Sequence, residues 1–356
     1  MESGKLLQRG AVEGMMIGRN GGFFKSWVVK INRLMLLVGQ RGIEIYPIMR
    51  LITIPCSFFS AALFFGGCSD SQRPKGANEL LDDEIRGRVV SVDLNKSLVS
   101  VEVIGTGQML DDQFSQNANN LGTFHAQPGD LSLMAPQNIY RAKAQETFTT
   151  DLGKAYLLTH VWPDNRVDRI RLNNVNRLLR RDTLSMGDKM IRMVGDFVPP
   201  FALYDQNGEI ITSEFFDGSV SVINFIFTRC SIAEMCPAAT SKMKKLQDLV
   251  EKTQVPYVKF LSITLDPEFD SPGVLKSYAR AYNINESNFK FGTAGKSVID
   301  DLANQFGILR KDQDNQPLDH TMRTMIINQR RQIVYQVPGK GWSVEDFLSR
   351  LDPESS

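Results

Sequence analysis

The C-terminal half of the chain alternates between short apolar runs and helical patterns. An Asn207-Gly208 turn joins two alternating segments, which is typical of a β-hairpin. The runs at 220–227 and 257–265 are almost continuously apolar, as expected of strands buried on both faces. Further patterns predict helices at 237–253, 271–282, 297–306 and 343–351, and a terminal hairpin at 325–335. This order predicts an α/β domain, a thioredoxin-like sandwich, over residues 195–352.

The preceding segment, residues 81–194, has a different pattern. Residues 85–93 and 98–104 alternate on either side of a turn, and 138–144 and 155–162 are two further strand candidates. We expect a small β-rich domain, for which a barrel is one arrangement, with a helix near its end. Asp164 is the predicted N-cap of that helix. Its predicted inner face is Val167, Ile170, Val175, Leu178 and Leu179.

The N-terminal region carries a compartment signal. Residues 49–67 have a basic start and an apolar core, which is typical of a signal peptide or a membrane segment. The stretch Phe65-Gly66-Gly67-Cys68 resembles a bacterial lipoprotein box, although leucine is usual where Phe65 stands. The resemblance implies cleavage before Cys68 and lipidation of its thiol, and an uncleaved membrane anchor is the alternative. Both place the rest of the chain in the cell envelope, facing the periplasm or the outside.

Two further segments flank the predicted signal at residues 49–67. Residues 68–80 are polar and predict a linker. Residues 1–48 precede the signal, whereas a signal should begin near the start of a chain. We therefore interpret 1–48 as a mis-assigned or disordered extension and Met49 as the true start.

Composition and charge narrow the function classes. The 356 residues are 42% hydrophobic and 23% charged, with a net charge of +1, so no bulk electrostatic attraction to nucleic acid is expected. Arginines between 166 and 181 are interpreted as a solvated helix face because no aromatic residues interleave with them. The chain has three histidines, of which His125 and His160 are interpreted as structural or surface residues.

Cysteine placement gives the main chemical clue. Cys56 lies in the signal and Cys68 is the predicted anchor, which leaves Cys230 and Cys236 for the folded part. Cys230 ends a buried strand, and Cys236 begins a helix whose N-terminus should lower the pKa of its thiol. Two such thiols indicate soft-metal binding, thiol–disulfide exchange or a structural disulfide. With the imidazole of His320 they would suit copper in either oxidation state, or zinc.

Residues 195–351 resemble the Sco/SenC family of copper-handling proteins. The matching stretches are Gly195-Asp-Phe-Val-Pro-Pro-Phe201, Asn224-Phe-Ile-Phe-Thr-Arg-Cys230, Cys236-Pro237, Asp266-Pro-Glu-Phe-Asp-Ser-Pro272, Phe291-Gly-Thr293 and Asp319-His-Thr321. The usual family motif has three residues between its cysteines, whereas this chain has five, so the loop must bulge. The resemblance implies Cys230, Cys236 and His320 as copper ligands, and a Cys230–Cys236 pair able to form a disulfide.

Two functions follow from the resemblance and the thiols. One is a metallochaperone that delivers copper to, or maintains the thiols of, the copper centre of a respiratory cytochrome oxidase. The alternative is a thioredoxin-like thiol–disulfide oxidoreductase using Cys230 and Cys236. Thioredoxin enzymes have a cis proline before the terminal hairpin, but this chain has His320-Thr321 there and Pro317 offset, which favours the metal. A third reading is a purely structural fold with a disulfide.

Three nearby side chains receive supporting roles. Asp266 and Asp319 are candidates for the group that orients the imidazole of His320. Met235 is interpreted as a hydrophobic lid, with a thioether ligand as the alternative.

Overall fold

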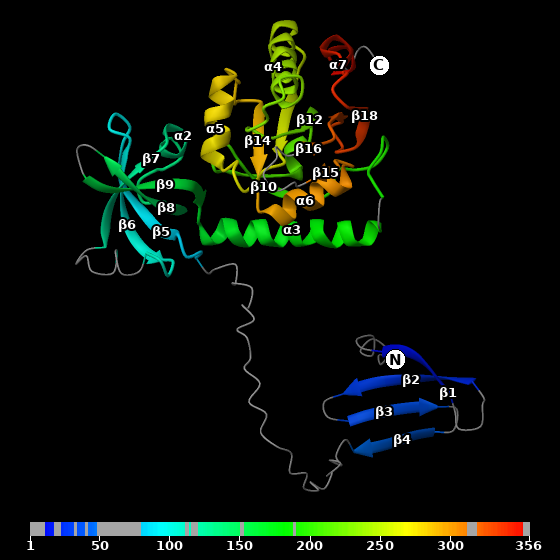
Figure 1. Cartoon of the computed structure of the whole chain (residues 1–356). Coiled ribbons are helices and arrows are strands. Elements are labelled where there is room, and N and C mark those ends of the chain that lie inside the picture. Colours follow the sequence, from blue (N-terminus) through cyan, green and yellow to red (C-terminus); the bar gives the residue numbers. More distant parts are fainter. Residues whose placement is uncertain are drawn as a thin grey trace, which may run out of the picture. The chain divides into compact units, whose positions relative to one another are not determined.

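The computed structural model of the chain describes residues 11–17, 23–31, 34–39, 42–47, 80–110, 114, 120–149, 153–187, 190–311 and 319–351. The chain divides into two units, Met1–Arg73 and Pro74–Ser356 (Figure 1). The predicted signal at 49–67, with Cys56 and Cys68, lies outside the described residues. Within the described ranges, no helix has both the length and the apolar character that a bilayer crossing requires.

The first unit contains an antiparallel sheet of four consecutive strands. The strands are β1 (Ala11–Ile17), β2 (Phe23–Ile31), β3 (Leu34–Gly39) and β4 (Gly42–Pro47). These four strands lie within residues 1–48, which were interpreted as a mis-assigned or disordered extension. That Met49 is the true start stays a prediction.

The second unit begins with a closed five-stranded barrel in the order β5-β6-β7-β9-β8. Its strands are β5 (Glu84–Asp93), β6 (Leu98–Thr106), β7 (Leu121–Ala126), β8 (Ile139–Thr149) and β9 (Gly153–Pro163). Inward-facing residues such as Val89, Val101 and Phe124 fill the interior. The sequence pattern did not predict β7, nor the short helix α2 (Pro128–Leu131) that follows it.

The long helix α3 (Arg166–Met186) differs from its prediction in two respects. Asn165, not Asp164, caps its N-terminus, because the Asn165 side chain accepts a hydrogen bond from the Val167 N–H at 2.8 Å. Asp164 instead forms ion pairs with Arg86 and Arg169. The buried positions are Leu172 and Leu179. Most of the predicted inner face is solvent-exposed, namely Val167, Ile170 and Leu178.

The C-terminal domain is built on a seven-stranded sheet in the order β11-β10-β14-β13-β12-β17-β18. The strands are β10 (Ala202–Asp205), β11 (Ile210–Thr212), β12 (Val220–Ile226), β13 (Val258–Thr264), β14 (Phe289–Thr293), β17 (Arg323–Ile327) and β18 (Ile333–Pro338). The three central strands are parallel, and the strands beyond them are antiparallel. This arrangement is the predicted thioredoxin-like sandwich.

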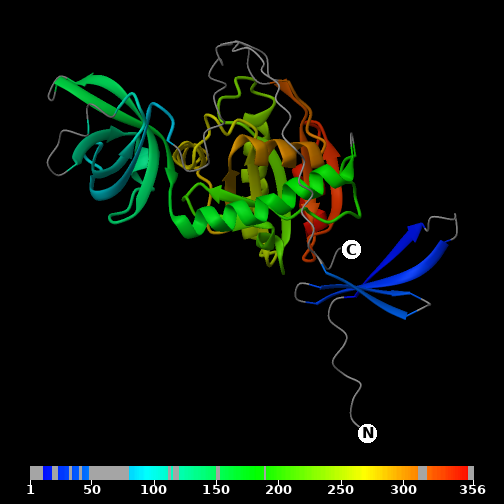
Figure 2. The ribbon, with the colours of Figure 1, turned by 90° about the horizontal axis from the view of Figure 1, so that it is seen from below.

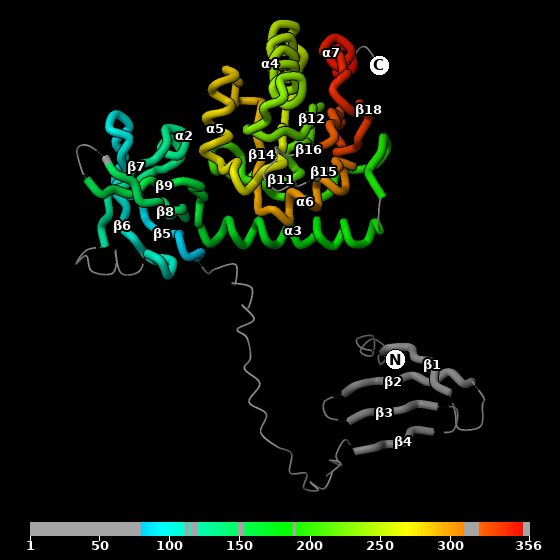
Figure 3. Tube along the Cα trace, viewed as in Figure 1, coloured from blue at the N-terminus to red at the C-terminus, as the bar shows by residue number. Residues whose placement is uncertain are grey.

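Helices cover both faces of this sheet. α4 (Cys236–Thr253), α5 (Pro272–Ala281) and α7 (Val344–Leu351) pack on one face, through residues such as Leu246, Leu275 and Phe347. α6 (Lys296–Gln305) and α3 pack on the other. Figure 2 shows α3 running across that second face. Figure 3 shows α3 starting at the end of β9 and passing below α6.

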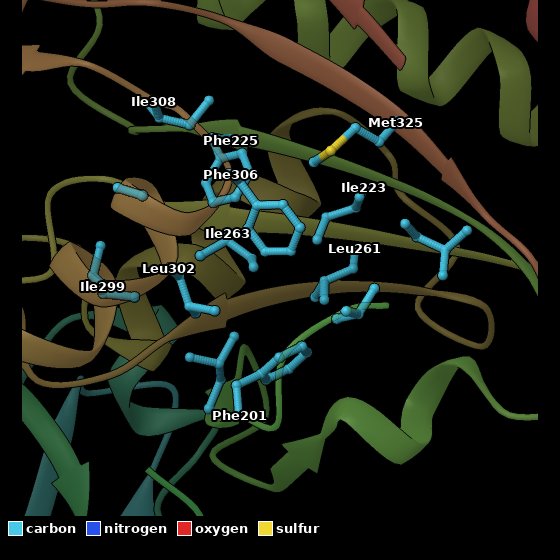
Figure 4. Close-up of a cluster of buried hydrophobic side chains, with 14 of the residues drawn as sticks. Phe201, Ile223, Phe225, Leu261, Ile263, Ile299, Leu302, Phe306, Ile308 and Met325 are labelled. Atoms are coloured by element: carbon cyan, nitrogen blue, oxygen red, sulfur yellow. The ribbon is translucent and has the colours of Figure 1, made fainter. Parts of the chain in front are cut away.

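The core under α6 shows why α3 belongs with the sheet. Figure 4 shows Phe225, Ile263 and Phe306 packed together within this core. Leu179 of α3 is a fully buried member of the same cluster. A domain boundary after residue 194 would leave α3 with the barrel, but its buried side chain packs on the C-terminal domain.

Candidate functional site

Cys236 lies at the junction of a strand and a helix on the sheet edge where α4 begins. The buried strand β12 ends at Ile226, the chain loops out, and α4 starts at Cys236 with Pro237 in its first turn. Proline suits that position because the first N–H groups of a helix have no intrahelical partner. The Cys236 side chain is fully buried and packs against Phe227, at the C-terminal end of the strand run.

His320 approaches Cys236 from a segment 84 residues further along the chain. Its Nε2 lies 3.5 Å from the Cys236 Sγ. The backbone of His320 is held by pairing of β16 (Asp319–His320) with β15 (Arg310–Lys311). The ring packs edge-on against Phe227, with centroids 5.4 Å apart, and only 5% of the residue is exposed.

The orientation of the imidazole follows from its second nitrogen. His320 Nδ1 lies 2.8 Å from the carbonyl oxygen of Thr321, which can only accept a hydrogen bond. The proton therefore resides on Nδ1, and Nε2 presents its lone pair toward Cys236. The side chain of Thr321 accepts the Leu309 N–H at 2.9 Å, which holds this segment in place.

Asp266 does not orient the imidazole as predicted. Its carboxylate accepts two hydrogen bonds from the guanidinium of Arg229, at 3.0 and 2.6 Å. The same guanidinium stacks over the ring of Phe269 at 4.3 Å. Arg229 and Asp266 thus tie the residue before Cys230 to the loop that follows β13. The side chain of Asp319 lies outside the described atoms, so its role stays a prediction.

Cys230 lies at the start of the bulged loop and is partly exposed. Its Sγ is 3.8 Å from the carbonyl oxygen of Ile232, and both it and Cys236 are free thiols. Among the described residues, no three His, Cys, Asp or Glu side chains are grouped closely enough to hold a metal. The structure therefore brings Cys236 and His320 together, with the Cys230 thiol close enough to Cys236 to raise its pKa.

The Cys236 thiol does not have the lowered pKa that its place at a helix N-terminus predicted. Burial raises the pKa of this thiol far above its ordinary value, and the nearby Cys230 raises it further. A backbone hydrogen bond from Phe227 acts in the opposite direction but is the smaller effect. Desolvation outweighs the helix dipole here because the sulfur is fully buried. Cys236 is therefore a neutral thiol in the absence of a bound cation.

Asp270 is a structural support of the site that the sequence analysis did not single out. Its fully buried carboxylate accepts the Thr228 N–H at 3.1 Å, the Thr264 hydroxyl at 2.5 Å and the Thr228 hydroxyl. Burial raises its pKa to about 6. Asp270 thereby joins the ends of β12 and β13 beneath the cysteine loop. Asp270 lies in the stretch 266–272 that resembles the family, together with Asp266.

The donor atoms of this site can be compared with those that a soft cation prefers. An imidazole lone pair and a buried thiol facing each other are donors that Cu(I) prefers, and the thiol would lose its proton on binding. The Cys230 thiol, which interacts with Cys236, is the candidate third donor. The donor set therefore fits copper.

The two other histidines lie in the barrel, away from these thiols. His125 is on β7 and His160 is on β9, where its Nδ1 is 3.2 Å from the Thr159 hydroxyl. Neither joins a metal-binding group among the described residues. Pro317, the offset proline, lies outside the described residues.

The C-terminal domain is similar to known proteins. The site is a thiol–imidazole pair at the strand-to-helix junction of a thioredoxin-like domain. The SCO1/SenC family model matches residues 190–352. Residues 190–352 therefore form a SCO1/SenC domain.

Individual relatives match the same part of the chain. A SCO2-like protein of Rickettsia typhi is 33% identical over 134 residues, which are 36% of this chain and 63% of that protein. The SCO1 protein homolog of Bacillus subtilis is 34% identical over 107 residues, or 30% and 54% of the two chains. This chain thus spans less than two thirds of the length of these relatives.

Solved structures of related proteins are also similar. A SCO1/SenC family lipoprotein from Bacillus anthracis is 24% identical, with a TM-score of 0.42 over 45% of this chain and 96% of that chain. The copper-bound ScoI of Bradyrhizobium japonicum is 22% identical, with a TM-score of 0.37 over 45% and 98%. The barrel lies outside the residues that the family model matches.

Proposed function

We propose that this protein binds copper through Cys230, Cys236 and His320 and delivers it to the copper centre of a respiratory cytochrome oxidase. The observation that carries the proposal is the 3.5 Å approach of His320 Nε2 to the buried Cys236 thiol. Copper is the transported substrate. Cys236 and His320 would provide two of the donors, and the neighbouring Cys230 thiol would provide the third.

The relatives support the metal and the acceptor. Copper is present in the Bradyrhizobium japonicum ScoI structure, and a further relative is described as a member of a family of cytochrome c oxidase assembly proteins.

A lipid on Cys68 would hold the domain at a membrane in the cell envelope, facing the periplasm or the outside. Intact-mass measurement of the membrane-bound protein tests this anchor. A mature chain that still contains residues 49–67 would contradict it.

The proposal is tested by removing the imidazole. We expect His320→Ala to weaken Cu(I) binding at least about a hundredfold, more than the loss of a ligand's hydrogen-bond partner usually causes. Competition with a Cu(I) chelator measures the affinity of the full chain. The matched control is His160→Asn, because asparagine tolerates the positive φ of 52° at that position. Equal affinities for His320→Ala and the wild type would contradict the three-ligand site.

Thiol–disulfide exchange is the second candidate, because both cysteines are free and the Cys230 thiol interacts with Cys236. The raised pKa of Cys236 opposes it, since a neutral thiol is a poor nucleophile. Turnover of insulin disulfides by the full chain separates the two functions. Insulin reduction that persists in His320→Ala would favour the oxidoreductase.

A further inference from the structure

A surface hollow of about 460 Å³ lies directly beside the candidate copper site. His320 and Thr321 form part of its wall, and Met235 and Met322 line it as well. The hollow therefore borders the site on one side and solvent on the other. The proposed copper ligands do not account for its two thioethers.

The two methionines reach this hollow from different parts of the fold. Met235 is the last residue of the cysteine loop, immediately before Cys236, and is partly buried. Met322 follows His320 by two residues and is 8% exposed. Its backbone carbonyl accepts the Gly339 N–H at 2.7 Å, which fixes the segment against the end of β18. The hollow is thus lined by two methionines as well as by His320, one from the cysteine loop and one from the segment after His320.

Thioether chemistry points to one ligand. A methionine sulfur is neutral and soft, so it binds Cu(I) without releasing a proton and has little affinity for harder cations. The rim also carries the cationic residues Arg323 and Lys340. Positive charge nearby weakens the binding of any cation, so copper held by these sulfurs would be held briefly.

We propose that Met235 and Met322 form an outer, transient Cu(I) position through which copper enters and leaves the Cys230, Cys236 and His320 site. This proposal rests on the proposed function. Copper stays Cu(I) throughout: the bonds to the Met235 and Met322 sulfurs break as bonds to His320 Nε2 and the thiols form. Cys230 and Cys236 each give up the thiol proton to water as the sulfur binds the ion.

The outer position is tested first by binding, without the inner thiols. Ag(I), a redox-inert substitute for Cu(I), is titrated into full-length Cys230→Ser/Cys236→Ser protein labelled with ¹³C at the methionine methyl groups. We expect the Met235 and Met322 resonances, assigned through single leucine variants, to shift together. Met109 on the barrel, which is 72% exposed, is the internal control and should not shift at the same silver concentration. Unshifted Met235 and Met322 resonances would overturn the proposal.

The second test is kinetic and uses leucine, which keeps the hollow apolar but removes the sulfur. We expect Met235→Leu/Met322→Leu to slow Cu(I) exchange with a chelator about tenfold, equivalent to about 1.4 kcal/mol in the barrier, with the equilibrium affinity unchanged. Met109→Leu is the matched control and should exchange at the wild-type rate. Wild-type exchange in the double variant would mean that the hollow acts only as an apolar surface, and would overturn the proposal.

Two further outcomes separate this proposal from the one on which it rests. An equilibrium affinity that falls as much as the rate would make the methionines ligands of the inner site, and would also overturn an outer position. If the wild type binds no Cu(I) tightly, the proposed function fails. The silver titration of the Cys230→Ser/Cys236→Ser variant would still report on Met235 and Met322 in that case.

Discussion

At the scale of single residues, two features of the site have opposite effects on metal binding: the burial of the Cys236 thiol and the fixed orientation of the His320 ring. The Cys236 thiol is fully buried, which raises its pKa and keeps it protonated without a cation. His320 compensates in part, because the Thr321 carbonyl fixes the proton on Nδ1 and leaves Nε2 facing the sulfur. Copper binding is therefore expected to release the protons of both thiols.

The buried carboxylate of Asp270 gives a prediction at this scale. Asp270→Asn replaces one acceptor oxygen with an amide that cannot accept the hydrogen bonds of Thr228 and Thr264. We expect the variant to lose about 1–3 kcal/mol of unfolding free energy, the usual result of leaving a buried polar group unsatisfied. Urea unfolding measures this loss.

An exposed carboxylate on the same domain provides the control for Asp270. Asp300 pairs with Lys296 one helical turn away, so Asp300→Asn should change stability by less than about 1 kcal/mol. Equal unfolding free energies for the two variants would show that Asp270 does not hold the ends of β12 and β13 together.

The sequence predicted the ligand types at this scale but not their surroundings. The strand–Cys and Cys-Pro–helix pattern and the Asp-His-Thr stretch identified Cys230, Cys236 and His320. Their environment depends on burial and on contacts between distant segments, such as Phe227 against His320. For this reason the pKa direction of Cys236 and the role of Asp266 were both predicted incorrectly.

At the scale of elements, short segments decide how the barrel and the C-terminal domain meet. α2 has four residues and packs against α5, where Gly129 and Gly273 allow the backbones to approach closely. A Cβ added at Gly129 would collide with the Gly273 carbonyl oxygen and the Ser277 hydroxyl. α5 begins directly after Asp270 and Ser271, so this contact adjoins the loop that supports the proposed copper site.

The glycine contact gives a prediction at the scale of elements. We expect Gly129→Ala to lower the unfolding free energy by about 1–3 kcal/mol, as overpacking of a close contact usually does. Chemical denaturation of the full chain measures this effect. Gly341→Ala is the control, because an added Cβ there meets no atom within 4 Å. A variant at Gly129 as stable as the wild type would mean that α2 and α5 separate easily.

Hydrophobic periodicity predicted the long elements well, for the physical reason that buried strands and amphipathic helices repeat a pattern. It predicted β12, β13, α4 and the terminal hairpin. It did not predict α2 or β7, because four to six residues are too few to show a period. On α3 it selected Leu179, which is buried, but it also selected the exposed Val167 and missed the buried Leu172.

At the scale of the whole molecule, contacts of α3 and of α2 help to join the barrel to the C-terminal domain. α3 leaves the barrel and pairs with the C-terminal domain through Arg180 and Asp301, at 2.7 Å. α2 packs on α5 with a buried acid, Asp130, at its centre. The order of elements along the chain could not predict this docking, since it depends on which short surfaces fit together.

Asp130 makes the docking of α2 on α5 depend on pH. The residue is 3% exposed, and its Oδ1 has no hydrogen-bond partner among the described residues. Burial raises its pKa from 3.8 to about 7. Because the folded state favours the protonated acid, the stability from this group is fully present below about pH 4 and is lost as the pH rises through about 7. The loss can reach about 4 kcal/mol, from about three pKa units at 1.36 kcal/mol each.

Replacing the acid with its neutral analogue should remove that dependence. Asp130→Asn is expected to have the wild-type melting temperature near about pH 4 and a higher one at about pH 8, where the wild-type carboxylate is forced to ionise in a buried contact. Thermal unfolding of both proteins across this range measures the difference. Asp300→Asn, on the exposed face of α6, should not reproduce the gain at high pH. Parallel pH profiles for Asp130→Asn and the wild type would mean that water reaches Asp130, and that the barrel docks on α5 less tightly than its burial indicates.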